Sequence, residues 1–100
     1  GAKTVSDLMD LNADIAFIGA NGVSFEGGVT AYDTDEAMVK RTMMANSLER
    51  ILLVDSGKFG SSYPARFATF DAFDRVVTNF DAEQRYVDGF SNAGVEVALA

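Results

Sequence analysis

The sequence predicts an α/β fold, a three-layer Rossmann-like parallel sheet flanked by helices. Unbroken apolar segments occur at residues 14–19 (DIAFIG) and 50–55 (RILLVD), and such runs are typical of strands with both faces covered. Stretches with the apolar spacing of helices separate the expected strands. Helices that alternate with buried strands favour a parallel sheet with right-handed crossovers.

Two further strands are expected in the second half of the chain. Residues 75–79 (RVVTN) form a shorter apolar run. Residues 95–99 (VEVAL) alternate instead, with Glu96 between two valines. Alternation indicates one face in water, so we place this last strand at an edge of the sheet.

Three helices are expected, each introduced by a polar capping residue with an acidic or amide residue three positions later. These pairs are Thr4 with Asp7, Asp33 with Glu36, and Asp81 with Gln84. We expect the second helix to extend to about residue 47. Gly94 is placed to end the third helix as the residue after its C-cap.

Composition predicts a single domain, residues 1–100, and excludes several kinds of chemistry. Cys and His are absent, which excludes disulfides, thiolate or imidazole metal ligands, and catalysis by either residue. We therefore expect no metal and no cofactor. A net charge of −7 makes the chain a poor binder of nucleic acid. No apolar run approaches the roughly 18 residues of a membrane span, so we expect a cytoplasmic protein without a membrane partner.

The first expected helix leads directly into a central-looking strand. A parallel sheet would supply an earlier strand from which that helix crosses over. We therefore expect the chain to be a fragment of a larger domain, with further strands upstream of Gly1.

Polar and glycine residues follow three of the expected strands. Gly19-Ala20-Asn21-Gly22 follows the first, Asp55-Ser56-Gly57-Lys58 the second, and Thr78-Asn79 the third. Ligands of open α/β sheets bind beyond the carboxyl ends of the strands. We expect a pocket at this edge.

Glycines are concentrated in residues 18–30, IGANGVSFEGGVT. Their spacing differs from the G-x-G-x-x-G dinucleotide motif, and no Gly-Lys-Ser/Thr of a phosphate-binding P-loop follows. Two interpretations remain. The stretch is either a long connection with residues at positive φ, or a glycine-rich turn whose backbone N–H groups bind an anion.

Lys58 is the sharper candidate for binding an anion. Three residues beyond a strand end, its ammonium can pair with a phosphate or carboxylate, while Asp55 orients it or accepts sugar hydroxyls. The alternative is a surface turn with a local Asp–Lys pair worth under about 1 kcal/mol. Glu36 and Lys40 have the spacing of an ordinary intrahelical ion pair.

The aromatic residues between positions 59 and 73 have two possible roles. Aromatic side chains stack on bases in proteins that bind single-stranded nucleic acid. Few basic residues surround these aromatics, so we favour packing in the core or at a subunit contact. The methionines at positions 38, 43 and 44 are likewise assigned to the core.

Several segments in order resemble the effector-sensing domain of DeoR-type transcriptional repressors. They are Asp14-Ile-Ala-Phe-Ile-Gly19, Gly22, Gly27-Gly28-Val29-Thr30, Glu36-Ala37, Val39-Lys40-Arg41 and Val54-Asp55-Ser56-Gly57-Lys58-Phe59-Gly60. The resemblance runs from about residue 14 to residue 79 and continues more weakly to the end. It implies a sensor that binds a phosphorylated sugar or related metabolite, oligomerises, and contacts DNA only through a winged helix-turn-helix domain absent from this chain.

The resemblance also implies a fold similar to ribose-5-phosphate isomerase and glucosamine-6-phosphate deaminase. By it, Lys58 matches a lysine near the substrate and Glu36 falls close to the isomerase's catalytic glutamate. Asn21 stands where the isomerase has an aspartate, and an amide cannot abstract a proton. The deaminase's histidine is absent. We therefore favour a sensor over an enzyme, with the isomerase or deaminase as the alternative. A purely oligomerising module with a structural glycine loop is a third possibility.

The sensor hypothesis assigns no catalytic residues and eight ligand-binding candidates. These are Gly19, Asn21, Gly22, Gly28, Thr30, Glu36, Asp55 and Lys58.

Overall fold

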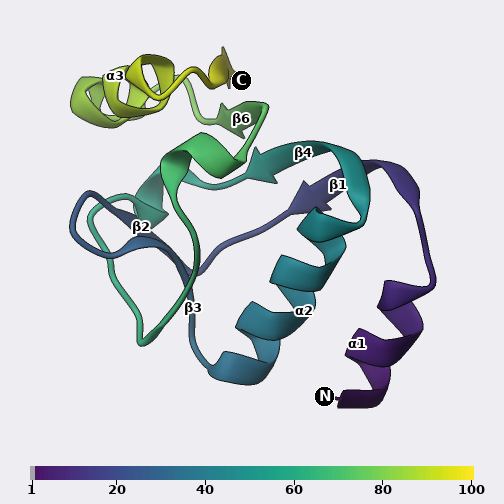
Figure 1. The fold of residues 1–100 in the computed structure, drawn as a ribbon. Coiled ribbons are helices and arrows are strands. Elements are labelled where there is room, and N and C mark those ends of the chain that lie inside the picture. Colours follow the sequence, from purple (N-terminus) through teal and green to yellow (C-terminus); the bar gives the residue numbers. More distant parts are fainter. Residues whose placement is uncertain (1) are drawn as a thin grey trace.

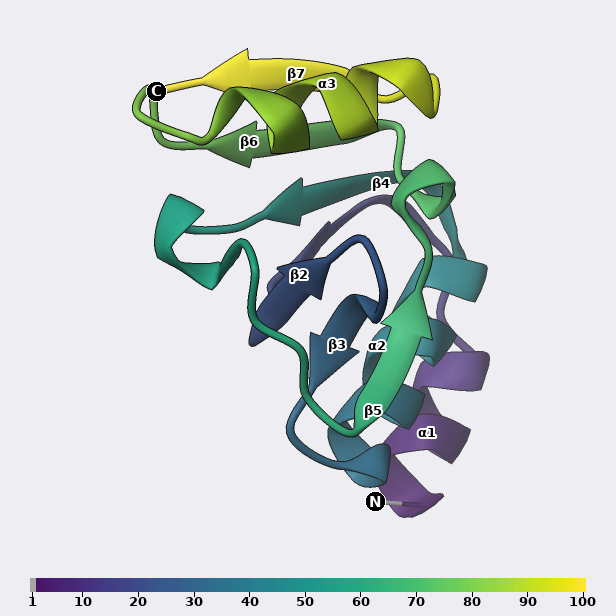
Figure 2. The ribbon, with the colours of Figure 1, turned by 90° about the vertical axis from the view of Figure 1, so that its left-hand side faces the viewer.

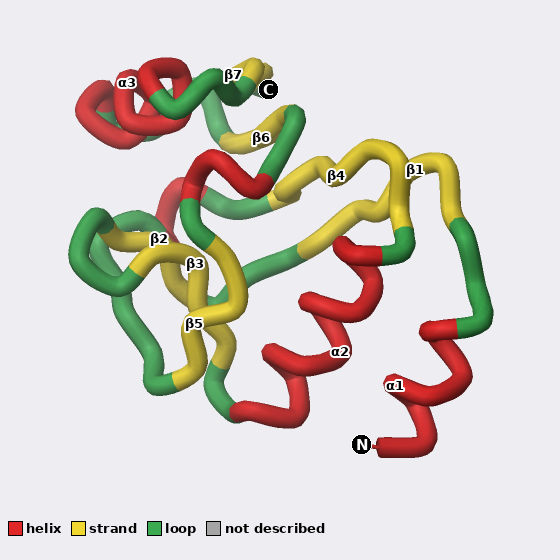
Figure 3. Tube along the Cα trace, viewed as in Figure 1, coloured by secondary structure: helices red, strands yellow, loops and turns green. Residues whose placement is uncertain are grey.

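A computed structural model describes residues 2–100 and contains one parallel and one antiparallel sheet (Figure 1). The parallel sheet has the order β1-β4-β6-β7, formed by β1 (Ala13–Ile18), β4 (Ser47–Leu53), β6 (Arg75–Thr78) and β7 (Glu96–Leu99). The antiparallel sheet has the order β2-β3-β5, formed by β2 (Gly22–Ser24), β3 (Gly28–Ala31) and β5 (Ala65–Ala68). The helices are α1 (Ala2–Met9), α2 (Thr34–Ala45) and α3 (Gln84–Asn92), with short 3₁₀ turns at Ser56–Lys58 and Phe70–Ala72 (Figure 3).

The parallel sheet confirms the predicted fold class. All four expected strands form, and each pairs in parallel with its neighbour. Ile18 is aligned with Leu52, and Leu52 with Val76, so the apolar runs meet in register. The alternating strand β7 pairs only with β6 and lies at the edge of the sheet, as predicted.

Helix α2 begins as its sequence predicts. Asp33 is the N-cap, and its carboxylate accepts a hydrogen bond of 2.9 Å from the backbone N–H of Glu36. The helix ends at Ala45, short of the expected residue 47, because Ser47 already pairs with Ala13 in the sheet. Gly94 follows the C-cap of α3 with φ +83°, which confirms its predicted role.

Two predicted caps were wrong. Thr4 lies inside α1 rather than before it. Helix α3 begins at Gln84, and Glu83 is its N-cap without a side-chain hydrogen bond. Asp81 instead accepts a hydrogen bond of 3.1 Å from the hydroxyl of Ser56, because a tertiary partner competes with the local capping position.

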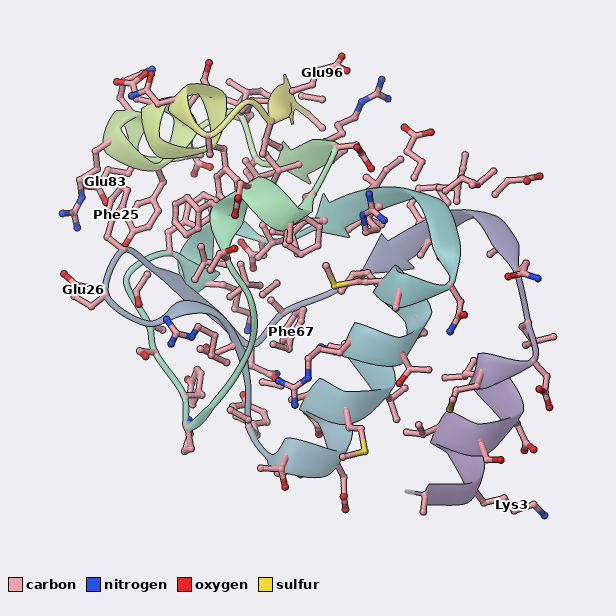
Figure 4. The ribbon with its side chains drawn as sticks, viewed as in Figure 1. Lys3, Phe25, Glu26, Phe67, Glu83 and Glu96 are labelled. Atoms are coloured by element: carbon pink, nitrogen blue, oxygen red, sulfur yellow. The ribbon has the colours of Figure 1, made fainter. Side chains whose placement is uncertain are left out.

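The glycine-rich stretch forms a β-hairpin, which the sequence analysis did not predict. Gly22 pairs with Thr30 and Ser24 with Gly28, and residues 25–27 make the turn. Figure 4 labels Phe25 and Glu26 at this tip, near α3. Its strands span only three and four residues, too short to reveal a period of two in the sequence. The long connection that we expected is therefore an ordered hairpin.

The core lies between the parallel sheet, the small sheet and the helices. Phe67 of β5 and Phe73 are 5% and 3% exposed. Phe59 stacks on Tyr86 with ring centroids 4.9 Å apart, and Phe70 stacks on Phe90 at 4.3 Å. The four phenylalanines of this segment therefore belong to the core or pack against it, as predicted, whereas Tyr63 is 36% exposed. Met44 is buried and Met43 packs against the core, whereas Met38 is 47% exposed.

The described helices leave one face of the parallel sheet open. Figure 2 shows the parallel strands side by side, with α3 in front of β6 and β7. Side chains alternate along a strand, and Ala16 and Ile18 of β1 are buried in the core. Ile15 and Phe17, which alternate with them, are 44% and 57% exposed, and Leu53 of β4 is 44% exposed. These three side chains form an apolar patch in contact with solvent on the second face.

We predict that Gly28→Ala lowers the free energy of unfolding by about 2–4 kcal/mol. An L side chain is strained at its φ of +75° by about 1–2 kcal/mol, and a Cβ there would lie 2.8 Å from the carbonyl oxygen of Ala68, adding overpacking. Urea unfolding followed by circular dichroism measures the loss. Gly94→Ala is the matched control, because its φ is +83° with no atom within 4 Å of a Cβ. Equal losses would contradict the close packing at Gly28.

We also predict that neighbouring residues on β1 differ sharply in their contribution to stability. Ile18 is 1% exposed, so Ile18→Thr is expected to cost about 2–4 kcal/mol. Phe17→Thr is expected to cost under about 1 kcal/mol, because the ring is already more than half exposed. The same unfolding measurement tests both variants, and a large loss for Phe17→Thr would show that this face is covered.

Candidate functional site

The carboxyl ends of β1, β4 and β6 bring candidate residues to one edge of the parallel sheet. Gly19 follows β1 and lies beside Leu53, whose carbonyl oxygen is 4.0 Å from the position of a Cβ on that glycine. Asp55 lies two residues beyond β4, and Asn79 follows β6. Residues that line an open hollow of about 460 Å³ at this edge are Leu53, Val54, Asp55, Val77, Thr78, Asn79 and Ala100. This hollow lies at the edge where the strand ends predict a pocket, but among the eight candidates only Asp55 lines it.

A contact between the two sheets adds Lys58 to this edge. Val23 and Phe59 form a parallel β-bridge, and the backbone N–H of Gly60 donates a 2.7 Å hydrogen bond to the carbonyl of Val23. Lys58 directly precedes this bridge and ends a 3₁₀ turn, whereas Gly22, directly before Val23, is buried. A Cβ on Gly22 would lie 2.4 Å from the carbonyl oxygen of Ser61. Glycine at this position is what lets the two backbones approach.

Asp55 organises the turn that presents Lys58. Its carboxylate accepts a 3.0 Å hydrogen bond from the N–H of Gly57, and the Asn79 side chain accepts a 2.9 Å bond from the N–H of Ser56. Lys58 ends this 3₁₀ turn. Among residues 2–100, the ion pairs do not include one between Asp55 and Lys58. The turn is thus held by backbone donors, and the ammonium is not engaged by the local pair considered as an alternative.

The hairpin uses most of its own polar groups. Asn21 donates its N–H to the carbonyl of Thr30 at 3.0 Å, and its side-chain oxygen accepts from the N–H of Tyr32 at 3.2 Å. The hydroxyl of Thr30 donates to the carbonyl of Gly22 and accepts from the N–H of Tyr63, both at 3.1 Å. The stretch is therefore no open cradle of backbone donors. The side-chain NH₂ of Asn21 is the group that this arrangement leaves for a ligand.

Thr30 and Gly28 are placed differently from the rest of the candidate set. Thr30 is fully buried, so its hydroxyl holds the hairpin to the segment that follows Lys58. Gly28 pairs with Ser24 at the far end of the hairpin from Gly22. The structure does not bring Gly28 to the carboxyl edge.

Helix α2 contributes Glu36 and Lys40. The ammonium of Lys40 donates a 2.7 Å hydrogen bond to the carbonyl of Gly19 and lies 5.2 Å from the ring centroid of Phe67. Burial lowers the pKa of Lys40, and the nearby Glu36 carboxylate partly opposes this by raising it. Both residues border a second open hollow, of about 310 Å³.

Sequence reasoning missed Lys40 as a site residue because its spacing from Glu36 fits an ordinary helical pair. Its place on the helix held a usable signal. Lys40 lies three residues after Ala37 and four before Met44, which are both buried, so it shares the helical stripe that faces the core. A lysine on such a stripe points its ammonium towards the element that packs against this face of the helix.

The candidate site is defined by charged and amide side chains. It combines two ammonium groups, an amide and carboxylates. Among residues 2–100, no group of three or more Asp or Glu side chains is arranged to hold a metal ion. No helix in the described part of the chain has the length and apolar character to cross a membrane.

Known proteins share parts of this sequence. Residues 1–80 match the family model of the DeoR C-terminal sensor domain. The chain is 39% identical over 74 residues to the deoxyribose operon repressor of Escherichia coli K12, covering 74% of this chain and 29% of the relative. It is 31% identical to the transcriptional repressor GlcR of Bacillus subtilis, covering 99% of this chain and 38% of the relative. The regulator GlpR of Haloferax volcanii is 32% identical, with 97% and 38% covered. The chain thus spans about a third of the length of these relatives.

The lowered pKa of Lys40 gives a prediction for stability against pH. Between that pKa and the ordinary value of 10.5, the unfolded chain binds more protons at this residue than the folded chain does. Raising the pH through this window therefore stabilises the folded state. We expect the free energy of unfolding of the wild type, relative to Lys40→Met, to rise as the pH increases through this window towards 10.5. Urea titrations across this range measure it, and a flat or falling difference would contradict the burial of the ammonium.

Proposed function

Because the chain belongs to the family of DeoR C-terminal sensor domains, we propose that it binds a phosphorylated sugar or related metabolite at the carboxyl edge of its parallel sheet. The relatives compared above are named as repressors and regulators of transcription. The chain is accordingly the sensor domain of a transcriptional regulator rather than an enzyme.

The observation that supports the proposal is that Gly19, Asp55 and Asn79 follow neighbouring parallel strands, with Lys58 at the end of the turn after β4. Open α/β sheets bind ligands at this edge. Lysine is a common binder of phosphate. Gly19 permits a ligand to approach the backbone closely, because a Cβ there would meet only the Leu53 carbonyl oxygen, at 4.0 Å.

Each candidate at the edge has a role that its surroundings allow. Lys58 pairs with the anionic group, and the NH₂ of Asn21 donates to a sugar oxygen. Asp55 accepts from a hydroxyl with the carboxylate oxygen that does not bind Gly57. Glu36 contacts a hydroxyl from α2, and Gly19 lets the ligand approach the end of β1.

Sensing requires that the ligand binds one conformation more tightly than another. We propose that this difference is passed, in the intact regulator, to a separate winged helix-turn-helix domain that contacts DNA. The relatives are about three times as long as their matched region, which is consistent with further domains. We also propose that the sensor forms homo-oligomers and works in the cytoplasm, where the DNA is.

We predict that a sugar phosphate raises the melting temperature of the protein and that Lys58→Ala weakens its binding at least tenfold, about 1.4 kcal/mol. A thermal-shift screen would compare ribose 5-phosphate, 2-deoxyribose 5-phosphate, fructose 1-phosphate and glycerol 3-phosphate with their unphosphorylated counterparts. One relative is named for a deoxyribose operon, which is the reason for including the second compound.

Lys3→Ala is the matched control for this screen. Lys3 projects from α1 (Figure 4), and the exposed residue is expected to leave binding unchanged. A response to no phosphorylated compound, or an equal response in Lys58→Ala, would refute the proposal. Turnover of ribose 5-phosphate that is lost in Glu36→Ala would show an enzyme instead.

A further inference from the structure

Lys40 reaches from the middle of α2 to the carboxyl end of β1. Its ammonium contacts the Gly19 carbonyl at 2.7 Å and faces the ring of Phe67 at 5.2 Å. Phe67 is almost fully buried, and Figure 4 labels it between the small sheet and α2. The charge is thus held in place by a neutral carbonyl and an aromatic face.

The ammonium has no carboxylate in contact. Among residues 2–100, the ion pairs join Arg50 with Asp74, Arg75 with Glu96, and Arg85 with Glu83. The charge of the Glu36 carboxylate raises the pKa of Lys40, but the two side chains do not form an ion pair. A partly buried cation whose partners are neutral retains much of its desolvation cost. An anion brought to this position would recover that cost.

Two lysines are associated with neighbouring strands of the parallel sheet. Lys40 contacts Gly19 directly after β1, and Lys58 ends the turn that follows β4, the strand paired with β1. A phosphate monoester carries between one and two negative charges near neutral pH. Two ammonium groups therefore match it better than one does.

We propose that Lys40 is a second cation of the ligand site, which exchanges the Gly19 carbonyl for the anionic group of the ligand. This deepens the proposed function and rests on it for the identity of the ligand. Releasing the Gly19 carbonyl frees the turn that carries Asn21, and Asn21 is hydrogen-bonded to Thr30 and Tyr32 of the hairpin. Binding at Lys40 is thereby linked to the small sheet.

Inorganic phosphate tests the proposal without any choice of sugar. Lysine ammonium and Cε signals of the wild-type chain would be followed by NMR during a phosphate titration at constant ionic strength, with chloride as the reference anion. We expect the Lys40 signals to shift saturably, together with the Gly19 carbonyl and the Asn21 amide. The signals of Lys3 are expected not to move.

Variants separate anion binding from a structural role. Lys40→Met is expected to weaken phosphate binding at least tenfold and to abolish the shifts at Gly19 and Asn21. Lys40→Arg, which keeps the charge, is expected to stay within about threefold of the wild type. Amide spectra report whether each variant keeps the fold, and Lys40→Arg remains informative where Lys40→Met does not fold.

The outcomes test the role of Lys40 separately from the proposed class of effector. Wild-type phosphate affinity in Lys40→Met, or phosphate titrations that leave the Lys40 signals in place, would overturn the role of Lys40 even if sugar phosphates stabilise the protein. Saturable shifts at Lys40 without stabilisation by any sugar phosphate would support Lys40 as an anion site and refute the proposed class of effector.

Discussion

The two sheets meet at the parallel bridge between Val23 and Phe59, and both the core and the site depend on this contact. Val23 is fully buried, and the N–H of Gly60 fixes its carbonyl at 2.7 Å. On the inner side of the bridge, the ring of Phe59 stacks almost flat on Tyr86, with an interplanar angle of 4°. On the other side, the bridge directly follows the turn that ends at Lys58. One backbone contact therefore joins the aromatic packing to the turn that carries a candidate site residue.

The aromatic packing gives this junction its rigidity. Phe25 at the hairpin tip also stacks on Tyr86, and the two ring centroids are 4.5 Å apart. The absence of a side chain at Gly89 makes room for Phe25, since a Cβ there would lie 2.7 Å from the ring. Such aromatic pairs contribute about 0.5–1.5 kcal/mol each beyond their buried area. The hairpin is held to α3 by these rings, and through the bridge α3 supports the position of Lys58.

The division of polar groups at this edge suits a binding site better than a catalytic one. Backbone donors of the hairpin and of the turn after β4 are satisfied within the protein, by Thr30, Asp55 and Asn79 among others. The polar groups that remain for a ligand are the charged or amide ends of side chains, carried by ordered backbone. Fixed tips select a ligand by charge and shape, whereas proton abstraction needs a base tuned near the working pH. The amide side chain of Asn21 is not such a base.

Much of the fold followed from local patterns. Unbroken apolar runs located β1, β4 and β6, alternation located the edge strand β7, and Asp33 marked the start of α2 to the residue. These predictions succeeded because a buried strand and a capped helix depend on the residues within a few positions. Asp81 failed for the opposite reason, since its partner, Ser56, is 25 residues away.

The glycine-rich hairpin, the place of Lys58 and the reach of Lys40 were decided only by the tertiary structure. Strands of three or four residues carry no readable period, and their pairing depends on which segments the core brings together. Lys40 has the spacing of a helical pair, and only the packing of α2 against β1 carries its ammonium to Gly19. By itself, the sequence determined the fold class, the strands whose ends form the edge proposed for binding, and the absence of histidine and cysteine chemistry. Which side chains meet at that edge followed from contacts between residues distant in the chain, and no local pattern encodes these.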